Sequence, residues 1–123
     1  MNIALWLSRS AERYPQQPAI AHGTEVWCDY AEMAGRAARS AQWLQTQGVQ
    51  PGERVVLFMG NAPEYLPLLW GVWWLGAVAV PVNAKLHPKE AAWIAGHSEA
   101  RIAFTDAPRA DELRSALQDR KSV

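Results

Sequence analysis

The chain has 123 residues, half of them hydrophobic and a fifth charged, which indicates one globular domain, or part of one, and excludes a disordered chain. Twelve basic residues balance twelve acidic ones, so the formal net charge is zero. No strong overall field therefore attracts the chain to nucleic acid or to an anionic membrane, and we expect no nucleic-acid partner.

The N-terminal part predicts a helix followed by a hairpin. Residues 2–13 carry apolar side chains on one helical face, with Asn2 as the predicted N-cap and Pro15 beyond the end. Residues 18–21 and 25–28 are two short runs with strand character around a turn at His22-Gly23-Thr24. This pattern is typical of a β-hairpin.

Residues 29–47 predict a long amphipathic helix. Asp29 followed by Glu32 indicates a capping box, and Gly48 supplies the C-cap. The apolar positions follow at helical spacing, and they are Tyr30, Met33, Ala34, Ala37, Ala38, Ala41 and Leu44. So many alanines predict a close approach to a neighbouring helix or sheet.

A turn at residues 50–53 leads into residues 54–59, an apolar run that favours a strand covered on both faces, as in a parallel sheet. A buried helix should follow, with Asn61 as its N-cap and Pro63 in its first turn. Pro67 lies too deep for a first turn and predicts a kink or a late start of the helix.

The remainder alternates strands and helices. Residues 77–80 predict a strand stopped by Pro81, residues 88–96 a helix, residues 101–105 a strand and residues 108–120 a helix. The predicted fold class is therefore α/β: a β-hairpin followed by β-α-β-α-β units, with a short parallel sheet flanked by helices and right-handed crossovers.

Cys28, the single cysteine, excludes an internal disulfide and any multi-cysteine metal site, and we expect it to be a small buried hydrophobe. The start of the chain lacks the organisation of a secretory signal. The apolar run at residues 65–82 is interrupted by Pro67 and Gly71 and leaves about ten helical residues, against the roughly 20 that a bilayer needs. We expect a soluble, cytoplasmic protein without a transmembrane segment.

The residues by themselves predict no catalytic centre. The sequence contains neither of the usual glycine-rich phosphate loops and none of the common zinc or serine-nucleophile motifs. His22, His87 and His97 are dispersed; we expect His22 to be solvated in the hairpin turn and His97 to interact with the negative end of a helix dipole. The residues by themselves therefore indicate only part of a soluble α/β domain.

Three segments, taken in chain order, match known sequence motifs. Residues 48–55 (GVQPGERV) resemble G-V-x-x-G-D-x-V, residues 61–65 (NAPEY) resemble N-x-P-E-[FY], and residues 76–86 (GAVAVPVNAKL) resemble G-A-V-x-V-P-[LV]-N-x-[RK]-L. Weaker matches lie upstream at Tyr14-Pro15, at Pro18-Ala19-Ile20 and at residues 29–33 (DYAEM). Together they resemble the N-terminal part of the AMP-forming acyl-CoA synthetase superfamily.

The resemblance implies a parent enzyme that joins a carboxylic acid to CoA through an acyl-adenylate, using ATP, Mg²⁺ and CoA. In that superfamily the phosphate loop, the adenine and ribose contacts and the catalytic lysine all come later in the chain. Residues 1–123 are then one incomplete AMP-binding domain with no second domain and no catalytic residue. The piece alone should be inactive, and its partner is the remainder of the parent ligase.

Two residues have an implied ligand role. In related CoA ligases the basic residue of N-x-[RK]-L lies near the phosphorylated nucleotide end of CoA, which here implies Lys85, with Asn83 beside it. A lysine ammonium is a suitable phosphate partner. The alternatives are that Lys85 is an ordinary exposed loop lysine and that Asn83 hydrogen-bonds its own backbone in a turn.

The acid is left open between a fatty acid, a coumarate-like aromatic acid and a small acid. Residues 80–88 (VPVNAKLHP) differ from the V-P-[LI]-D-P-x-x-P of peptide-synthetase adenylation domains and favour a stand-alone acyl- or aryl-CoA ligase, as does a start at Met1. The competing class is a short natural interaction or assembly module with exposed tryptophans. A small flavodoxin-like nucleotide binder is disfavoured. Exposed apolar surface around Trp70, Trp73, Trp74 and Trp93 predicts self-association.

Overall fold

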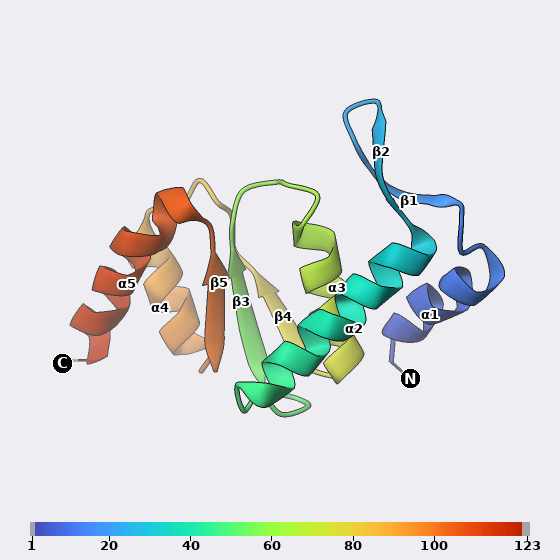
Figure 1. Cartoon of the computed structure of the whole chain (residues 1–123). Coiled ribbons are helices and arrows are strands. Elements are labelled where there is room, and N and C mark those ends of the chain that lie inside the picture. Colours follow the sequence, from blue (N-terminus) through green and yellow to red (C-terminus); the bar gives the residue numbers. More distant parts are fainter. Residues whose placement is uncertain (1, 122–123) are drawn as a thin grey trace. The chain divides into compact units, whose positions relative to one another are not determined.

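The computed structural model describes residues 2–121 and confirms the α/β fold (Figure 1). Within those residues the elements are, in chain order, α1 (Ala4–Arg13), β1 (Pro18–His22), β2 (Glu25–Asp29), α2 (Tyr30–Thr46), β3 (Arg54–Phe58), α3 (Tyr65–Leu75), β4 (Val78–Pro81), α4 (Pro88–His97), β5 (Ile102–Thr105) and α5 (Ala107–Lys121). The predicted elements are all present, and most boundaries agree to within a residue or two.

The chain forms two compact units whose segments alternate along the sequence. The first unit combines Met1–Gly52 with Asn61–Val78, and the second combines Glu53–Gly60 with Ala79–Val123. The first therefore holds α1, the hairpin, α2 and α3. The second holds the parallel sheet, α4 and α5.

Helix α1 begins later than predicted. Its first residue is Ala4, so the prediction of Asn2 as the N-cap residue is wrong and Ile3 holds that position. Asn2 still contributes, because its Oδ1 accepts a hydrogen bond from the Ala4 amide at 2.8 Å while its Nδ2 donates to the Trp73 carbonyl at 2.6 Å. The asparagine thereby ties the start of α1 to the end of α3.

The hairpin and α2 form as predicted. Strands β1 and β2 pair antiparallel, and the Asp29 carboxylate accepts from the Glu32 amide at 2.9 Å at the start of α2. At the other end Gly48 is left-handed (φ 89°), and the Val49 amide donates to the Leu44 carbonyl at 3.1 Å. This is the Schellman ending that a glycine favours.

Helices α2 and α3 approach closely at Gly71. A Cβ added there would lie 2.5 Å from Ser40 Cβ and 2.9 Å from the Ala37 carbonyl oxygen. The small residues of α2 therefore face a helix, which confirms the close approach that its alanines predict. Helix α3 starts only at Tyr65, so Asn61 is not its N-cap; Pro67 is the third helical residue, and the late start is confirmed.

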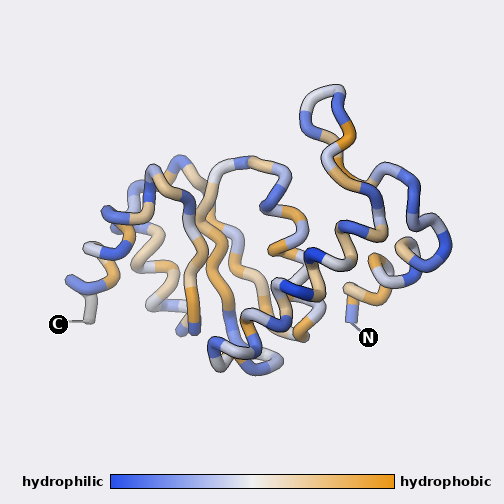
Figure 2. The backbone as a smooth tube through the Cα atoms, viewed as in Figure 1, coloured by the Kyte–Doolittle hydropathy of each residue, from blue (hydrophilic) through white to orange (hydrophobic). Residues whose placement is uncertain are grey.

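The second unit is built on a three-stranded parallel sheet in the order β4-β3-β5. Strand β3 runs parallel to β5, with Val55 opposite Ile102 and Phe58 opposite Thr105. Figure 2 shows β3 as a hydrophobic segment, and its residues from Val55 to Phe58 are fully buried. This is the continuous apolar strand that the sequence predicts.

Helices α4 and α5 cover one face of this sheet. The core between the sheet and these helices is formed by Val56, Phe58 and Val82 from the sheet region, Ala91, Ala92 and Ala95 from α4, and Leu113 and Ala116 from α5. Strand β4 includes Pro81, where the sequence predicts a stop, and α4 reaches His97. Because the three strands are parallel, they end at the same edge of the sheet, where the candidate site lies.

The Gly71 contact can be tested by adding one methyl group. Gly71→Ala should lower the free energy of unfolding by about 1–3 kcal/mol, because the new Cβ overlaps α2 backbone and forces the helices apart. Urea titration followed by circular dichroism measures this. Gly35→Ala is the matched control, since a Cβ there meets only the mobile end of Arg39. Helix propensity should make the control neutral or more stable, and equal stability of Gly71→Ala and wild type would contradict the packing.

Candidate functional site

Polar groups gather where the three parallel strands end. Gly60 follows β3, Asn83 and Lys85 follow β4, and Asp106 follows β5. In open α/β sheets, ligands bind at the carboxyl ends of the strands. The two residues that the sequence singles out therefore lie on the edge where the fold class places binding sites.

Asn83 shapes the loop after β4. Its side-chain Oδ1 accepts a hydrogen bond from the Lys85 amide at 2.9 Å, and its backbone carbonyl accepts from the Leu86 amide at 3.0 Å. The side chain thus forms the turn that the sequence offers as the alternative to ligand contact. The single side-chain oxygen of Asn83 is therefore hydrogen-bonded within the loop.

Lys85 presents its ammonium to solvent. The residue is exposed, and within residues 2–121 the ion pairs found do not include it. Next along the chain, His87 is the N-cap of α4, with its Nδ1 accepting from the Lys89 amide at 3.1 Å. The sequence gives His87 no role, and the structure gives it this one.

An aspartate and an arginine join the three strand ends. Asp106 Oδ2 accepts from the Gly60 amide at 2.8 Å and from Arg109 NH1 at 2.5 Å, and Arg109 Nε donates to the Ala84 carbonyl at 3.0 Å. The guanidinium also lies 5.9 Å from the centroid of the Phe58 ring. We refer to Asp106 and Arg109 as the edge pair.

Asp106 is ionised at neutral pH. The Gly60 amide, followed by the Arg109 guanidinium, holds the pKa of Asp106 below its usual value, against the opposing effect of burial. Both side chains are 28% exposed, so water screens their attraction only in part. Charge-assisted hydrogen bonds of this kind are among the stronger ones in proteins.

Sequence reasoning missed the edge pair. One signal was available: Asp106 stands between an apolar strand and a helix with Pro108 in its first turn, a common place for an acidic residue. The bond from Gly60 to Asp106 spans 46 positions, and pattern reading gives no access to such a contact. The bond from Arg109 to Ala84 spans 25 positions and is equally hidden.

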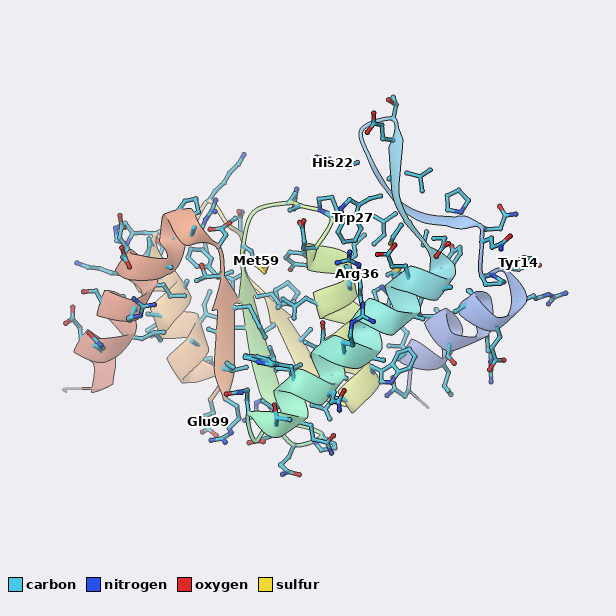
Figure 3. The ribbon with its side chains drawn as sticks, viewed as in Figure 1. Tyr14, His22, Trp27, Arg36, Met59 and Glu99 are labelled. Atoms are coloured by element: carbon cyan, nitrogen blue, oxygen red, sulfur yellow. The ribbon has the colours of Figure 1, made fainter. Side chains whose placement is uncertain are left out.

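The other candidate reactive groups have structural roles. Cys28 is buried, as predicted, and burial followed by the charge of Glu32 raises the pKa of its thiol. His22 is exposed at the end of β1, as predicted. His97 ends α4 and stacks on Trp93 at 4.8 Å between ring centroids. Arg36 lies over the Trp27 ring at 4.4 Å, with both side chains visible in Figure 3.

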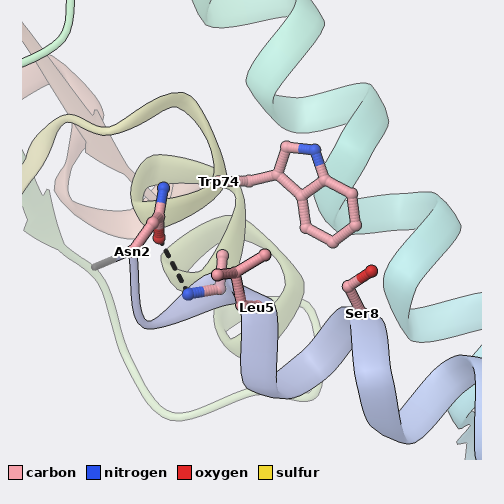
Figure 4. Close-up of a pocket in the computed structure, with 5 residues that line it drawn as sticks. Asn2, Leu5, Ser8 and Trp74 are labelled. Atoms are coloured by element: carbon pink, nitrogen blue, oxygen red, sulfur yellow. Dashed lines mark hydrogen bonds between the residues drawn. The ribbon is translucent and has the colours of Figure 1, made fainter.

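Among the described residues of the first unit, the hollows include the following three. One, of about 210 Å³, is lined by Asn2, Ala4, Leu5, Ser8 and Trp74 (Figure 4). A second, of about 360 Å³, shares Asn2 and includes Trp73. A third, of about 330 Å³, lies between the hairpin and the start of α3 and includes His22 and Tyr65, the pKa of which is raised by burial. Their lining is mainly apolar, which gives no group of catalytic side chains.

No cluster of three or more His, Cys, Asp or Glu side chains within residues 2–121 has the arrangement of a metal site. In the same part of the chain no helix has the length and hydropathy required to cross a membrane.

Comparison with known proteins decides the family. The model of the family described as AMP-binding enzyme matches residues 7–123. The chain belongs to the AMP-binding enzyme family. It is 36% identical over 110 residues to the long-chain-fatty-acid–CoA ligase FadD13 of Mycobacterium tuberculosis, covering 89% of this chain and 22% of that protein. It is 39% identical over 84 residues to a feruloyl-CoA synthase of Amycolatopsis sp., covering 68% of this chain and 17% of that protein.

A solved structure gives the same result for the fold. The N-terminal domain of FACL13 from Mycobacterium tuberculosis superposes with a TM-score of 0.84 at 32% identity, covering 100% of this chain and 31% of that one. The chain spans about a fifth of the length of the curated relatives it matches. The three motif segments between residues 48 and 86 all lie within the family match.

We expect the edge pair to contribute to the free energy of unfolding in a way that depends on pH. Asp106→Asn should lower the free energy of unfolding at pH 7 by about 2 kcal/mol, since hydrogen bonds to charged groups contribute roughly 1.5–3 kcal/mol. The pKa of Asp106 is lower in the folded than in the unfolded chain. The contribution is therefore complete above about pH 4 and is lost as the pH falls through the lower, folded pKa.

Urea titrations from pH 7 to pH 2 measure that contribution. The difference between wild type and Asp106→Asn should shrink across the acidic range. Asp111→Asn is the control, because Asp111 is exposed and pairs with Arg114 at 3.5 Å on the surface of the same helix. Its effect should stay below about 0.5 kcal/mol. A gap for Asp106→Asn that is as large at pH 2 as at pH 7 would contradict the ionised contact.

Proposed function

We propose that this chain is the N-terminal part of a carboxylic acid–CoA ligase. The complete enzyme condenses an acid with ATP to an acyl-adenylate and diphosphate, and then transfers the acyl group to the thiol of CoA, releasing AMP. The observation that carries the proposal is the family match over residues 7–123 together with relatives that are CoA ligases. The short share of those relatives that the chain covers supports its being one part of a larger enzyme.

In this proposal the 123 residues are an incomplete AMP-binding domain without a second domain and are inactive alone. The two compact units are parts of that one domain. ATP and Mg²⁺ bind to the remainder of the ligase, because the sequence has no glycine-rich phosphate loop. The remainder is the natural partner for the exposed apolar side chains, of which Trp6, Trp43 and Trp93 are the largest. A cytoplasmic location remains a prediction from the sequence.

The acid is a fatty acid or a coumarate-like aromatic acid. Support comes from the names of two relatives, one a long-chain-fatty-acid–CoA ligase and the other a feruloyl-CoA synthase. The identities, 36% and 39%, do not favour one over the other. Both acids give the same two-step reaction, so the choice affects the substrate panel and not the mechanism.

Lys85 binds the phosphorylated nucleotide end of CoA, and Asn83 lies beside it. The support is the resemblance of residues 83–86 to the N-x-[RK]-L motif of related CoA ligases, together with the position of the loop. Lys85 is exposed at the carboxyl edge of the sheet, in a loop fixed by the Asn83 turn and by Arg109. A flexible ammonium pairs with phosphate as a point charge, so this contact contributes affinity and little orientation. The Asn83 side chain keeps its amide nitrogen for a ligand while its oxygen holds the turn.

A second candidate function is a short interaction or assembly module. The exposed tryptophans Trp6, Trp43 and Trp93 favour it, since large apolar side chains on a surface mark interfaces. It predicts that the 123-residue chain self-associates. Sedimentation of the chain over a concentration series measures this, and a monomer at every concentration counts against the module.

The ligase proposal is tested by comparing the complete protein with the 123-residue chain. The complete protein should form acyl-CoA and AMP from ATP, CoA and one member of a panel that includes palmitate, coumarate, ferulate, benzoate and acetate. The 123-residue chain should form neither acyl-adenylate nor acyl-CoA with any of them. Turnover by the short chain, or a complete protein that ends at Val123, would contradict the proposal.

The Lys85 contact is tested in the complete protein with a matched pair of variants. Lys85→Met should raise KM for CoA about fivefold, because one partly exposed charge contact contributes about 1 kcal/mol. The exchange of diphosphate into ATP, which needs no CoA, should be unchanged. Lys89→Met removes an equally exposed charge four residues later and should leave both unchanged. An unchanged KM for CoA in Lys85→Met would refute the contact.

A further inference from the structure

We infer that Arg109, held by Asp106, is a positioning residue for CoA binding: it fixes the peptide that carries Lys85. The inference rests on the proposed function, because it assigns a task to the loop on which Lys85 stands. Neither residue is a catalytic residue in it. Arg109 acts through the backbone of Ala84, and Asp106 acts through Arg109.

The first step concerns the Ala84 peptide. Its carbonyl, which directly precedes Lys85, accepts from Arg109 Nε at 3.0 Å. The amide on the other side of the same peptide group belongs to Lys85 and donates to Asn83 Oδ1 at 2.9 Å. Both polar atoms of one peptide are therefore held by side chains. The direction in which the Lys85 side chain leaves the backbone follows from the orientation of that peptide.

The second step concerns the guanidinium. Arg109 donates through Nε to Ala84 and through NH1 to Asp106, while Asp106 also receives the Gly60 amide at 2.8 Å. Two donors at a fixed angle on one planar group connect two acceptors, which a lysine ammonium cannot reproduce. These hydrogen bonds therefore connect the loop after β4 to the end of β3.

The third step separates positioning from direct binding. The charge of Arg109 faces a carboxylate and lies against the Phe58 ring, whereas Lys85 is exposed. An anion that approached Arg109 would compete with Asp106. The arginine is therefore expected to supply geometry, and the lysine to supply the charge that meets the phosphate.

The experiment uses the complete ligase with Arg109→Lys, Arg109→Gln, Lys85→Met and the double variant Arg109→Gln/Lys85→Met. The readouts are KM for CoA, kcat and the CoA-independent exchange of diphosphate into ATP. Both Arg109 variants should raise KM for CoA about threefold to fivefold, at most the Lys85→Met effect, and leave exchange unchanged. The double variant should be no worse than Lys85→Met, since Arg109 acts through Lys85. Arg114→Gln, an exposed arginine on the same helix, is the control.

Each other outcome contradicts the inference in a recognisable way. If Arg109→Lys keeps the wild-type KM while Arg109→Gln does not, charge and not geometry matters. If the effects of Arg109→Gln and Lys85→Met add, Arg109 does not act through Lys85. If exchange is lost as well, the pair supports the fold and not the loop. If Arg109 variants behave like wild type while Lys85→Met does not, only the positioning role fails.

A separate measurement distinguishes failure of the proposed function. Amide hydrogen exchange at Lys85 and Gly60 should accelerate in Arg109→Gln whether or not CoA binds there. If amide hydrogen exchange at Lys85 is faster in Arg109→Gln while Lys85→Met leaves KM for CoA unchanged, the edge pair holds the loop but the loop does not bind CoA. Unchanged exchange at Lys85 means that Arg109 does not hold the loop.

Discussion

Asp106 accepts the Gly60 amide and the Arg109 guanidinium on one carboxylate oxygen, and through Arg109 it reaches the Ala84 carbonyl. These bonds connect the segments after β3, β4 and β5, which a sheet alone leaves as three independent loops. The ordering of the Asn83–Lys85 turn depends on them. Because the carboxylate is charged and only partly exposed, this small network can hold the loops without a large apolar contact.

The first unit depends on contact of a different kind. Gly71 lets α3 approach α2 so closely that one methyl group would overlap Ser40 and the α2 backbone. Asn2 then ties α1 to the end of α3 through the Trp73 carbonyl. Close packing of small residues and the Asn2 hydrogen bond help to hold this unit together, and its hollows have no group of catalytic side chains. The chemistry of the chain is accordingly concentrated on the sheet edge of the second unit.

Local signals carried most of the fold. Asp29 at the start of α2, Gly48 after α2 and the apolar run of β3 each determine structure over a few residues and are confirmed. Of the predicted capping box only the Asp29 half forms, because the Glu32 carboxylate pairs with Arg36. The predicted caps Asn2 and Asn61 failed because the helices start later, where tertiary bonds and Pro67 favour it. At the site, Asn83 and Lys85 followed from family resemblance. Asp106 and Arg109 did not, since their partners are 46 and 25 positions away.

We propose that this edge of the sheet belongs to a CoA ligase and receives the nucleotide end of CoA. A crystal structure of the complete protein with CoA tests it most directly. We expect a CoA phosphate within hydrogen-bonding distance of Lys85 Nζ, with the Arg109 bond to the Ala84 carbonyl intact. A CoA nucleotide bound elsewhere, with the Lys85 side chain in solvent, would contradict it.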